Sequence, residues 1–378
     1  MLKALTNARI FTADQWLENQ ALVFDTGRIQ ALLPNEDLPR DIQQQDLSGQ
    51  YLVPGLIDTQ VNGGGGVLFN DAPTLNGLRT LTAAHRRFGT TGLLPTLISD
   101  DRAVMARALQ AVDDALAQGL PGLLGIHLEG PFLNPKRKGV HDEHKFQILD
   151  EAGFELLISL KKGRTLVTLA PECTRPEMIQ RLVQSGVIVA AGHTAATYEQ
   201  TREALTAGLN SFTHLFNAMT PLTGRQPGVV GAALEDPNSW CGLIVDGHHV
   251  HPASLKVAIA AKPRGKMLLV TDAMPSVGAK NKSFWLKGEH IQARDGRCAT
   301  ADGTLAGSDL DMLSAVRNSV ELLNLPLAEA LRMASLYPAQ MLGLDTELGR
   351  LEPGYRANMI ALNPELELTH SWIEGRTD

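Results

Sequence analysis

The chain has 378 residues, of which 44% are hydrophobic and 20% charged, with a formal net charge of -7 at pH 7. This acidic balance argues against a general nucleic-acid binder, although a local basic pocket for a small phosphate is compatible with it. No apolar run approaches the roughly 18 residues of a membrane helix, and the polar N-terminus does not resemble a signal peptide. We therefore expect a cytoplasmic protein with no membrane partner. Cys173, Cys241 and Cys298 lack paired spacing, so neither a disulfide framework nor a cysteine zinc site is expected.

The two ends of the chain carry a similar pattern. Residues 1–50 contain short runs such as ALTNARIFTA and ALVFDTGRIQALL, separated by turn signals that predict small antiparallel strands. The tail LGRLEPGYRANMIALNPELELTHSWIEG has the same character. We therefore expect residues 1–52 and 346–378 to form one small β-sandwich domain beside a central domain of residues 53–345.

From residue 51 onward, short apolar runs alternate with segments of helical period. Near-continuous apolar strands, each followed by a helix, indicate an α/β fold with a parallel sheet covered on both faces. Eight such strands predict a closed, TIM-like (β/α)8 barrel. The runs are YLVPGLIDTQVN, TTGLLPTLIS, GLLGIHLEG, RTLVTLAPE, GVIVAAGHT, GLNSFTHLFN, WCGLIVDGHHV and KMLLVTDAMP. Between Ser276 and Ser308 the pattern predicts hairpins inserted after the eighth strand, before a helix near 309–324.

Polar side chains stand where several of these strands end. Glu129 ends the third, His193 the fifth, His214 the sixth and Asp272 the eighth. In a barrel these ends share one rim, and a His₂Glu set suits a catalytic zinc with one position open for water. Asp272 is then placed to take a proton from that water. Each residue alone could be a structural hydrogen-bonding group, but burying all four without an ion is costly.

The motifs resemble those of the N-acetylglucosamine-6-phosphate deacetylase family, within the amidohydrolase superfamily. The resemblance covers nearly the whole chain. Its most specific parts are HLEGP with the later GVH, and THLFNAM with GRQPG, whereas PGLID alone marks only the superfamily. LVTDAMP, GTLAGSDLDM and the tail LGRLEPGYRANMIAL also agree with it.

The resemblance implies a role for each matching residue. Glu129, His193 and His214 correspond to metal ligands, and Asp272 to the general base and acid. His141 corresponds to a residue that contacts the sugar and orients or polarises the acetamide carbonyl. Asn217 and Ala218 correspond to residues that contact the substrate. Arg225 and His249 correspond to the pair that binds its phosphate group. From its residue type alone, Arg225 could equally be a solvated loop charge.

The implied reaction is hydrolysis of N-acetyl-D-glucosamine 6-phosphate to D-glucosamine 6-phosphate and acetate by a metal-activated water. It would serve amino-sugar catabolism and cell-wall sugar recycling. The family also implies a homodimer with phosphate-site residues near the interface. The sequence does not discriminate between sugar epimers.

Many amidohydrolases carry a His-x-His pair after the first strand, where this chain has Gln60 and Asn62. Amides are weak ligands for a transition metal, so we expect one divalent metal per subunit, Zn²⁺ with Fe²⁺ as the alternative. Gln60 is then predicted to contact the metal-bound water, the alternative being that the amides satisfy backbone groups at the glycine turn. His127 is predicted to be a core histidine and His85 a surface residue.

Two other functions remain open at this point. A cyclic-amide hydrolase related to dihydroorotase would need the first-strand histidine pair and a lysine near the fourth strand. Here the fourth run, RTLVTLAPE, has no lysine and ends on Glu172. A non-catalytic barrel homologue is the second alternative, against which the four rim residues argue.

Overall fold

The structure, a computed structural model, describes residues 2–39 and 41–377. Its centre is a sheet of eight parallel strands in the order β17-β16-β15-β14-β13-β12-β11-β8. The strands are β8 (Leu56–Val61), β11 (Thr90–Ile98), β12 (Gly125–Glu129), β13 (Arg164–Leu169), β14 (Ile188–Ala191), β15 (Ser211–Phe212), β16 (Trp240–Leu243) and β17 (Met267–Leu269). Each falls within one of the eight apolar runs of the sequence. All nine residues of β11 are buried, as expected for a strand covered on both faces.

The sheet nearly closes into a barrel where the first and last strands meet. The backbone N–H of Asp272 donates to the carbonyl of Gln60 (3.0 Å), and that of Asn62 donates to the carbonyl of Ala273 (2.9 Å). The predicted (β/α)8 fold is therefore confirmed. The seam also brings the end of the first strand, with its two amides, beside Asp272.

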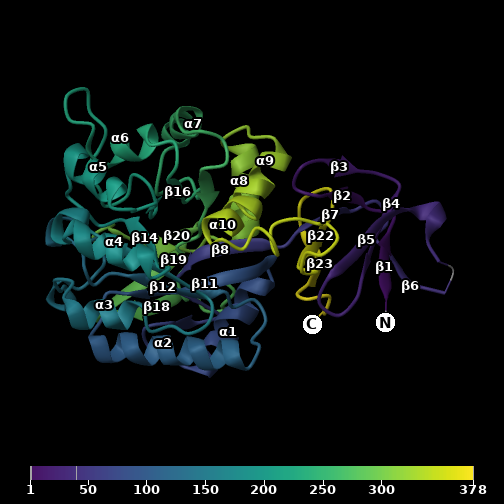
Figure 1. The fold of residues 1–378 in the computed structure, drawn as a ribbon, viewed down its shortest axis with the longest axis horizontal. Coiled ribbons are helices and arrows are strands. Elements are labelled where there is room, and N and C mark those ends of the chain that lie inside the picture. The colour runs from purple at the N-terminus through teal and green to yellow at the C-terminus, as the bar shows by residue number, and fades with distance from the viewer. Residues whose placement is uncertain (1, 40, 378) are drawn as a thin grey trace.

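Helices surround the sheet on the outside of the barrel (Figure 1). They are α1 (Leu75–Arg86), α2 (Arg102–Ala117), α3 (Glu151–Leu157), α4 (Pro176–Gln184), α5 (Tyr198–Thr206), α6 (Gly228–Glu235), α7 (Pro252–Ala261), α8 (Met312–Glu321), α9 (Leu327–Met333) and α10 (Leu336–Met341). Local sequence explains their starts: Thr197 and Gln200 form a capping box at α5, and Asp311 accepts from the N–H of Ser314 at α8.

The two ends of the chain meet in a small β unit beside the barrel, where Figure 1 places both termini. One sheet has the order β5-β4-β1-β6 and the other β23-β22-β7-β2-β3. A shared core of Leu22, Phe24, Met359 and Trp372 lies between them, which gives the predicted sandwich. The strands are β1 (Lys3–Thr6), β2 (Arg9–Phe11), β3 (Trp16–Leu17), β4 (Gln20–Phe24), β5 (Ile29–Pro34), β6 (Gln43–Asp46), β7 (Tyr51–Pro54), β22 (Met359–Leu362) and β23 (Leu368–Trp372).

The predicted antiparallel pairing of the N-terminal strands is correct for β1 with β4, β4 with β5 and β2 with β3, but not for two other pairs. β1 pairs in parallel with β6, and β2 pairs in parallel with β7. β6 lies beside β1 at the edge of one sheet, and β7 lies between β2 and β22 inside the other, so each runs in the same direction as the early strand that it pairs with.

The predicted insertion after the eighth strand is a four-stranded sheet of β18 (Ser283–Leu286), β19 (Glu289–Arg294), β20 (Arg297–Ala299) and β21 (Leu305–Ser308). Its apolar face shares a small core with Ile98, at the end of β11, and with Met274, in the segment that follows β17. A two-stranded hairpin, β9 (Gly63–Gly64) and β10 (Val67–Leu68), follows β8. The insertion therefore lies against the rim at which the barrel strands end.

His85 was predicted to lie on the surface, and this is wrong. Its ring is fully buried, with Nε2 lying 2.8 Å from the carbonyl oxygen of Gly63. A Cβ on Gly64 would lie 2.7 Å from the same nitrogen. The glycine run after β8 therefore leaves the space into which this histidine of α1 packs.

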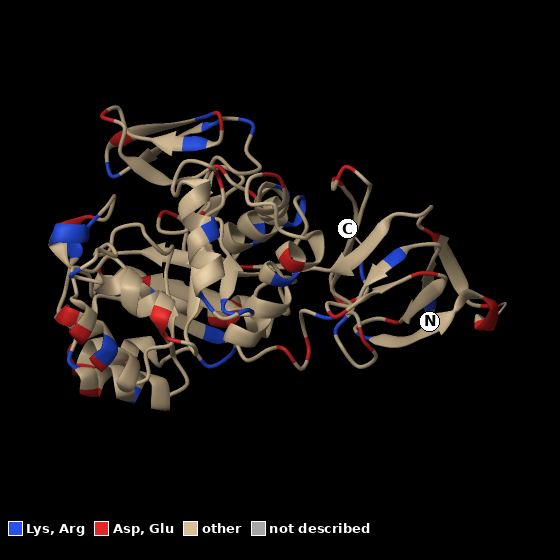
Figure 2. Cartoon of the chain, turned by 90° about the horizontal axis from the view of Figure 1, so that it is seen from above, with Lys and Arg blue, Asp and Glu red and all other residues tan. Residues whose placement is uncertain are grey.

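In Figure 2 the acidic and basic residues are interspersed along the ribbons. Among residues 2–39 and 41–377, no helix is both long and apolar enough to cross a bilayer.

Candidate active site

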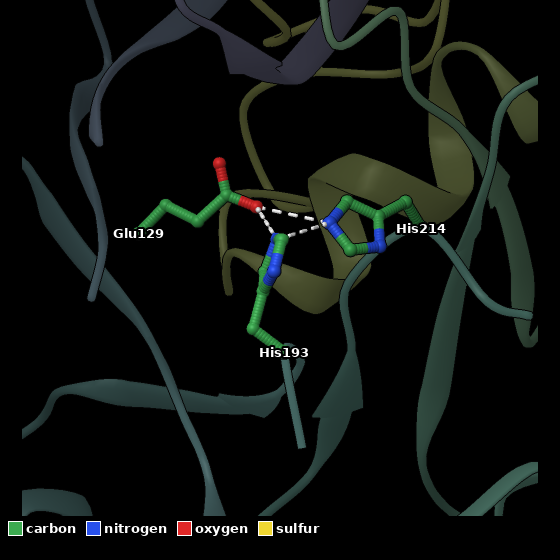
Figure 3. A group of neighbouring side chains, drawn as sticks. All are labelled: Glu129, His193 and His214. Atoms are coloured by element: carbon green, nitrogen blue, oxygen red, sulfur yellow. Dashed lines mark hydrogen bonds and ion pairs between the residues drawn. The ribbon is translucent and has the colours of Figure 1, made fainter. Parts of the chain in front are cut away.

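Three buried side chains, from the ends of β12, β14 and β15, converge at the barrel mouth (Figure 3). Nε2 of His214 lies 3.0 Å from Oε1 of Glu129 and 3.1 Å from Nε2 of His193. Nε2 of His193 lies 3.3 Å from the same carboxylate oxygen. The backbone is left-handed at both histidines, with φ of 47° and 32°, which turns their side chains away from the strand direction.

The donor chemistry of these residues fits a metal ion. Nδ1 of His193 lies 2.8 Å from the carbonyl oxygen of Arg137, so it must carry the hydrogen, and in the neutral ring Nε2 then has a lone pair. That lone pair faces the acceptor Oε1 of Glu129, which is unfavourable unless a cation lies between them. Tetrahedral bonds of about 2.0–2.1 Å would place ligand atoms about 3.3 Å apart. The observed separations agree with a divalent-metal site of Glu129, His193 and His214.

Asp272 lies beside this group and is held by the two amides. Nε2 of Gln60 donates to Oδ1 of Asp272 (3.2 Å) and to Oε1 of Glu129 (3.1 Å), and Nδ2 of Asn62 donates to Oδ1 of Asp272 (2.5 Å). The amide side chains thus bind carboxylates rather than backbone groups of the glycine turn. Desolvation, together with the charge of Glu129, raises the pKa of Asp272 to about 6, against the effect of the Asn62 hydrogen bond.

His141 faces the same cavity from the loop after β12. Its ring centroid lies 4.3 Å from that of His193, and its Nδ1 contacts Ser99. Burial holds the pKa of His141 well below its usual range, so the ring is neutral near neutral pH. A neutral imidazole here can donate a hydrogen bond without adding charge.

The cavity at the barrel mouth has a volume of about 270 Å³. This is near the lower end of typical ligand sites, roughly 300–1,000 Å³, and suits a molecule of monosaccharide size. Beside the metal group it is lined by Asp272, His141, Asn217, Ala218 and His249. Thr304 and Leu305 of the inserted sheet form part of its wall.

His249 and Arg225 were both predicted to bind the phosphate. Within a single chain, only His249 lines this cavity. Nδ1 of His249 lies 2.6 Å from Oδ2 of Asp246, which fixes the ring. Burial opposes ionisation of Asp246, but the hydrogen bond and charge of His249 hold its pKa below the ordinary value. Arg225 lies in an exposed loop and lines a different cavity, beside Arg137 and Tyr198.

Comparison with known proteins agrees with this geometry. The sequence model of the Amidohydrolase family matches residues 51–377, and that of the NagA composite domain matches residues 3–52. The chain belongs to the amidohydrolase family. It is 40% identical to the N-acetylgalactosamine-6-phosphate deacetylase of Shewanella sp. (strain ANA-3), over 97% of this chain and 94% of the relative. It is 35% identical to the N-acetylglucosamine-6-phosphate deacetylase of Haemophilus influenzae, over 100% of this chain and 99% of the relative.

A solved structure gives the same result for the fold. The N-acetylglucosamine-6-phosphate deacetylase of Pasteurella multocida superposes with a TM-score of 0.97 at 37% sequence identity, with 100% of both chains covered.

His127 of this amidohydrolase is a core residue, as predicted. The ring is 1% exposed, and its nitrogens contact Oγ1 of Thr96 (3.3 Å) and Oγ1 of Thr168 (2.7 Å). It therefore joins three neighbouring strands inside the barrel, below the metal group.

Sequence reasoning missed two carboxylates that support the rim. Asp58 accepts from Thr271 Oγ1 and from the N–H of Thr271 across the barrel seam, and burial raises the pKa of Asp58 to about 7. Glu172 accepts from the N–H of Ala195 and from Nδ2 of Asn134 (2.9 Å), beside His193. Both stand in or just after barrel strands. That position was the available signal, but it does not distinguish a supporting carboxylate from a ligand.

Proposed function

We propose that this chain hydrolyses the acetamide of N-acetyl-D-glucosamine 6-phosphate to D-glucosamine 6-phosphate and acetate, in amino-sugar catabolism and the recycling of cell-wall sugars. The observation that carries the proposal is the convergence of a candidate metal group, a carboxylate and a neutral histidine in one cavity of monosaccharide size. The names of the full-length relatives support the same reaction.

The metal would be held by Glu129, His193 and His214, one per subunit, with Zn²⁺ preferred and Fe²⁺ as the alternative. A divalent cation at such a site lowers the pKa of a bound water and polarises a carbonyl group. The side chains of Gln60 and Asn62 donate hydrogen bonds to carboxylates. A second cation at this place would instead need ligand atoms that present lone pairs to it. This arrangement supports a single metal, and metal content after dialysis tests it: two equivalents per subunit would contradict it.

Asp272 is the proposed general base and acid. Both amides donate to its Oδ1, and Oδ2 has no partner among the residues that the structure describes, so Oδ2 is free to take a proton. As the water attacks the acetyl carbon, Asp272 accepts its proton. Asp272 then gives that proton to the sugar nitrogen as the carbon–nitrogen bond breaks, which releases acetate and the amine. His141 donates to the carbonyl oxygen, on which negative charge develops.

Asn217 and Ala218 are proposed to contact the sugar, because both line the cavity beside the metal group. His249, at the same cavity, is proposed to bind the phosphate together with Arg225. Since Arg225 does not reach this cavity within one chain, we propose that a second subunit supplies it and that the enzyme is a homodimer. A guanidinium fork suits a phosphate dianion.

We further propose a cytoplasmic enzyme, because the substrate is a charged sugar phosphate. The division into a small domain of residues 1–52 and 346–378 and a barrel of residues 53–345 is kept as a proposal. Residues 1, 40 and 378 of that division lie outside the described residues.

The C4 epimer, N-acetyl-D-galactosamine 6-phosphate, is a second candidate substrate. The Shewanella relative that acts on this epimer by name is 40% identical, against 35% for the Haemophilus relative named for the glucosamine derivative. The two sugars differ only in the orientation of one hydroxyl group.

The test measures acetate release from both phosphorylated epimers and from unphosphorylated N-acetylglucosamine, with enzyme of known metal content. We expect rapid turnover of a phosphorylated sugar alone, and Asp272→Asn should keep its metal while losing turnover about 10²–10⁴-fold. Arg225→Ala should raise KM for the phosphorylated sugar. Failure of the metal-loaded enzyme to release acetate from either phosphorylated epimer would reject the proposal.

A further inference from the structure

Ser99 is a buried serine that directly follows β11 and has no role in the proposed reaction as described so far. We propose that Ser99 is a positioning residue that sets the tautomer of His141, so that His141 presents an Nε2–H donor to the acetamide carbonyl oxygen. The second half of this inference rests on the proposed function, since it concerns the reaction in which His141 takes part.

The contact between the two residues determines which ring nitrogen carries the hydrogen. The backbone nitrogen of Ser99 lies 3.3 Å from Nδ1 of His141, and Oγ of Ser99 lies 2.8 Å from the same atom. A backbone N–H can only donate, so Nδ1 must accept and therefore has no hydrogen. In the neutral ring the hydrogen is then on Nε2. The serine hydroxyl can rotate to donate to the same lone pair.

In the neighbouring His193 the hydrogen is on the other ring nitrogen, Nδ1, because that nitrogen meets an acceptor and not a donor. Nδ1 of His193 lies 2.8 Å from the carbonyl oxygen of Arg137, which can only accept, so Nδ1 of His193 carries the hydrogen. Two rings whose centroids are 4.3 Å apart thus meet backbone groups of opposite polarity. The result is a lone pair on Nε2 of His193, as a metal ligand needs, and a hydrogen on Nε2 of His141.

Nε2 of His141 is available for a ligand. His141 lines the cavity at the barrel mouth, and within residues 2–39 and 41–377 we find no hydrogen-bond partner for this nitrogen. An Nε2–H here can donate to a carbonyl oxygen that becomes negative during attack. The other tautomer would direct a lone pair toward the lone pairs of that oxygen, which is repulsive.

The surrounding structure holds Ser99 in place. A Cβ on Gly130 would lie 2.3 Å from Oγ of Ser99, so the glycine after Glu129 leaves room for the hydroxyl. On the other side, Asn70 exchanges hydrogen bonds with Ile98: its Oδ1 accepts from the N–H (3.1 Å) and its Nδ2 donates to the carbonyl (2.9 Å). The residue before Ser99 is thereby fixed, and with it the direction of the Ser99 N–H.

The first experiment observes the tautomer without any substrate. Nitrogen NMR of the metal-loaded enzyme, labelled with ¹⁵N-histidine, distinguishes a ring nitrogen that carries hydrogen from one that does not, and the signals lost in His141→Gln assign those of His141. We expect Nδ1 without hydrogen and Nε2 with it. A hydrogen on Nδ1 would overturn the proposal whatever the activity, so this outcome is separate from failure of the proposed function.

The second experiment asks whether the tautomer matters for turnover. Glutamine places its amide nitrogen near the position of Nε2 and asparagine near that of Nδ1, so His141→Gln should retain more kcat than His141→Asn. Ser99→Ala should lower kcat about 10-fold with KM changed less than about 2-fold, since one hydrogen bond is lost while the backbone N–H remains. The control is Ser319→Ala, which removes another buried hydroxyl, one bonded only within α8.

Two kinetic results would contradict the proposal. Equal kcat for His141→Gln and His141→Asn, or Ser99→Ala indistinguishable from Ser319→Ala, would reject the positioning role.

Discussion

Replacement of Asn62 by alanine should shift the acid limb of the pH–activity profile. Nδ2 of Asn62 donates to Oδ1 of Asp272 (2.5 Å), and Asn62 is only 2% exposed. A hydrogen bond to a charged group contributes about 1.5–3 kcal/mol, and one pKa unit corresponds to about 1.4 kcal/mol. Because the bond stabilises the carboxylate, its loss should raise the pKa of Asp272 by about 1–2 units.

The sign of the effect follows from the proposed role. Asp272 must be ionised to accept a proton, so kcat/KM should decline as the pH falls through its pKa. That pKa is raised to about 6 by burial and by the charge of Glu129, and a bound cation lowers it, so the limb of the unmodified enzyme lies at or below about pH 6. In Asn62→Ala the decline of kcat/KM should begin at a higher pH. The value of kcat/KM above that range should change less than its value at acid pH.

The assay is kcat/KM for the phosphorylated sugar as a function of pH, with metal content measured in each sample. Asn363→Ala is the matched control, because Asn363 lies in the exposed turn after β22 and its side chain bonds only to Glu367. An acid limb that stays in place in Asn62→Ala, at unchanged metal content, would refute the assignment of that limb to Asp272.

Three further predictions follow from the packing of the rim. His214→Ala should lose its metal on dialysis, as measured by metal analysis, and one retained equivalent would contradict the ligand assignment. Asp58 has a pKa of about 7 when folded, above its unfolded value of 3.8, so its contribution to the free energy of unfolding should fall by about 4 kcal/mol as pH rises through that window. Asp58→Asn, which can still pair with Thr271, should lack this slope in denaturant titrations of metal-free protein; an unchanged slope would refute the shift. Gly130→Ala should cost about 1–3 kcal/mol, because its φ is 88° and the new Cβ would meet Ser99; unchanged thermal unfolding would contradict this.

The barrel could be predicted because its signal is local. Each strand is a continuous apolar run, and the polar residue that ends it marks the rim, so the sequence alone places Glu129, His193, His214 and Asp272 together. The convergence of three of them within hydrogen-bonding distance follows from the order of the strands in the sheet.

The groups that determine which ring nitrogen of His141 and His193 carries the hydrogen could not be predicted in this way. Ser99 meets His141 from 42 positions away, and the carbonyl of Arg137 meets His193 from 56 positions away. A backbone carbonyl or N–H leaves no sequence signal at all. The error at His85 has a similar origin, because the space for its ring comes from the missing side chain of Gly64 on another element.

The site is built on backbone that is unfavourable for side-chain-bearing residues. Left-handed φ values occur at His193 (47°), His214 (32°), Ala218 (52°) and Asp272 (53°). Such positions cost on the order of 1–3 kcal/mol each and persist only where neighbouring contacts require them. Glu172 supplies such a contact beside His193 by accepting from the N–H of Ala195, and the N–H of Ser308 does so for Asp272 by donating to its carbonyl (2.9 Å). Since a strand continued in extended geometry would direct these side chains differently, the position of His193 in the metal group depends on the contact of Glu172, and the position of Asp272 beside that group depends on the contact of Ser308.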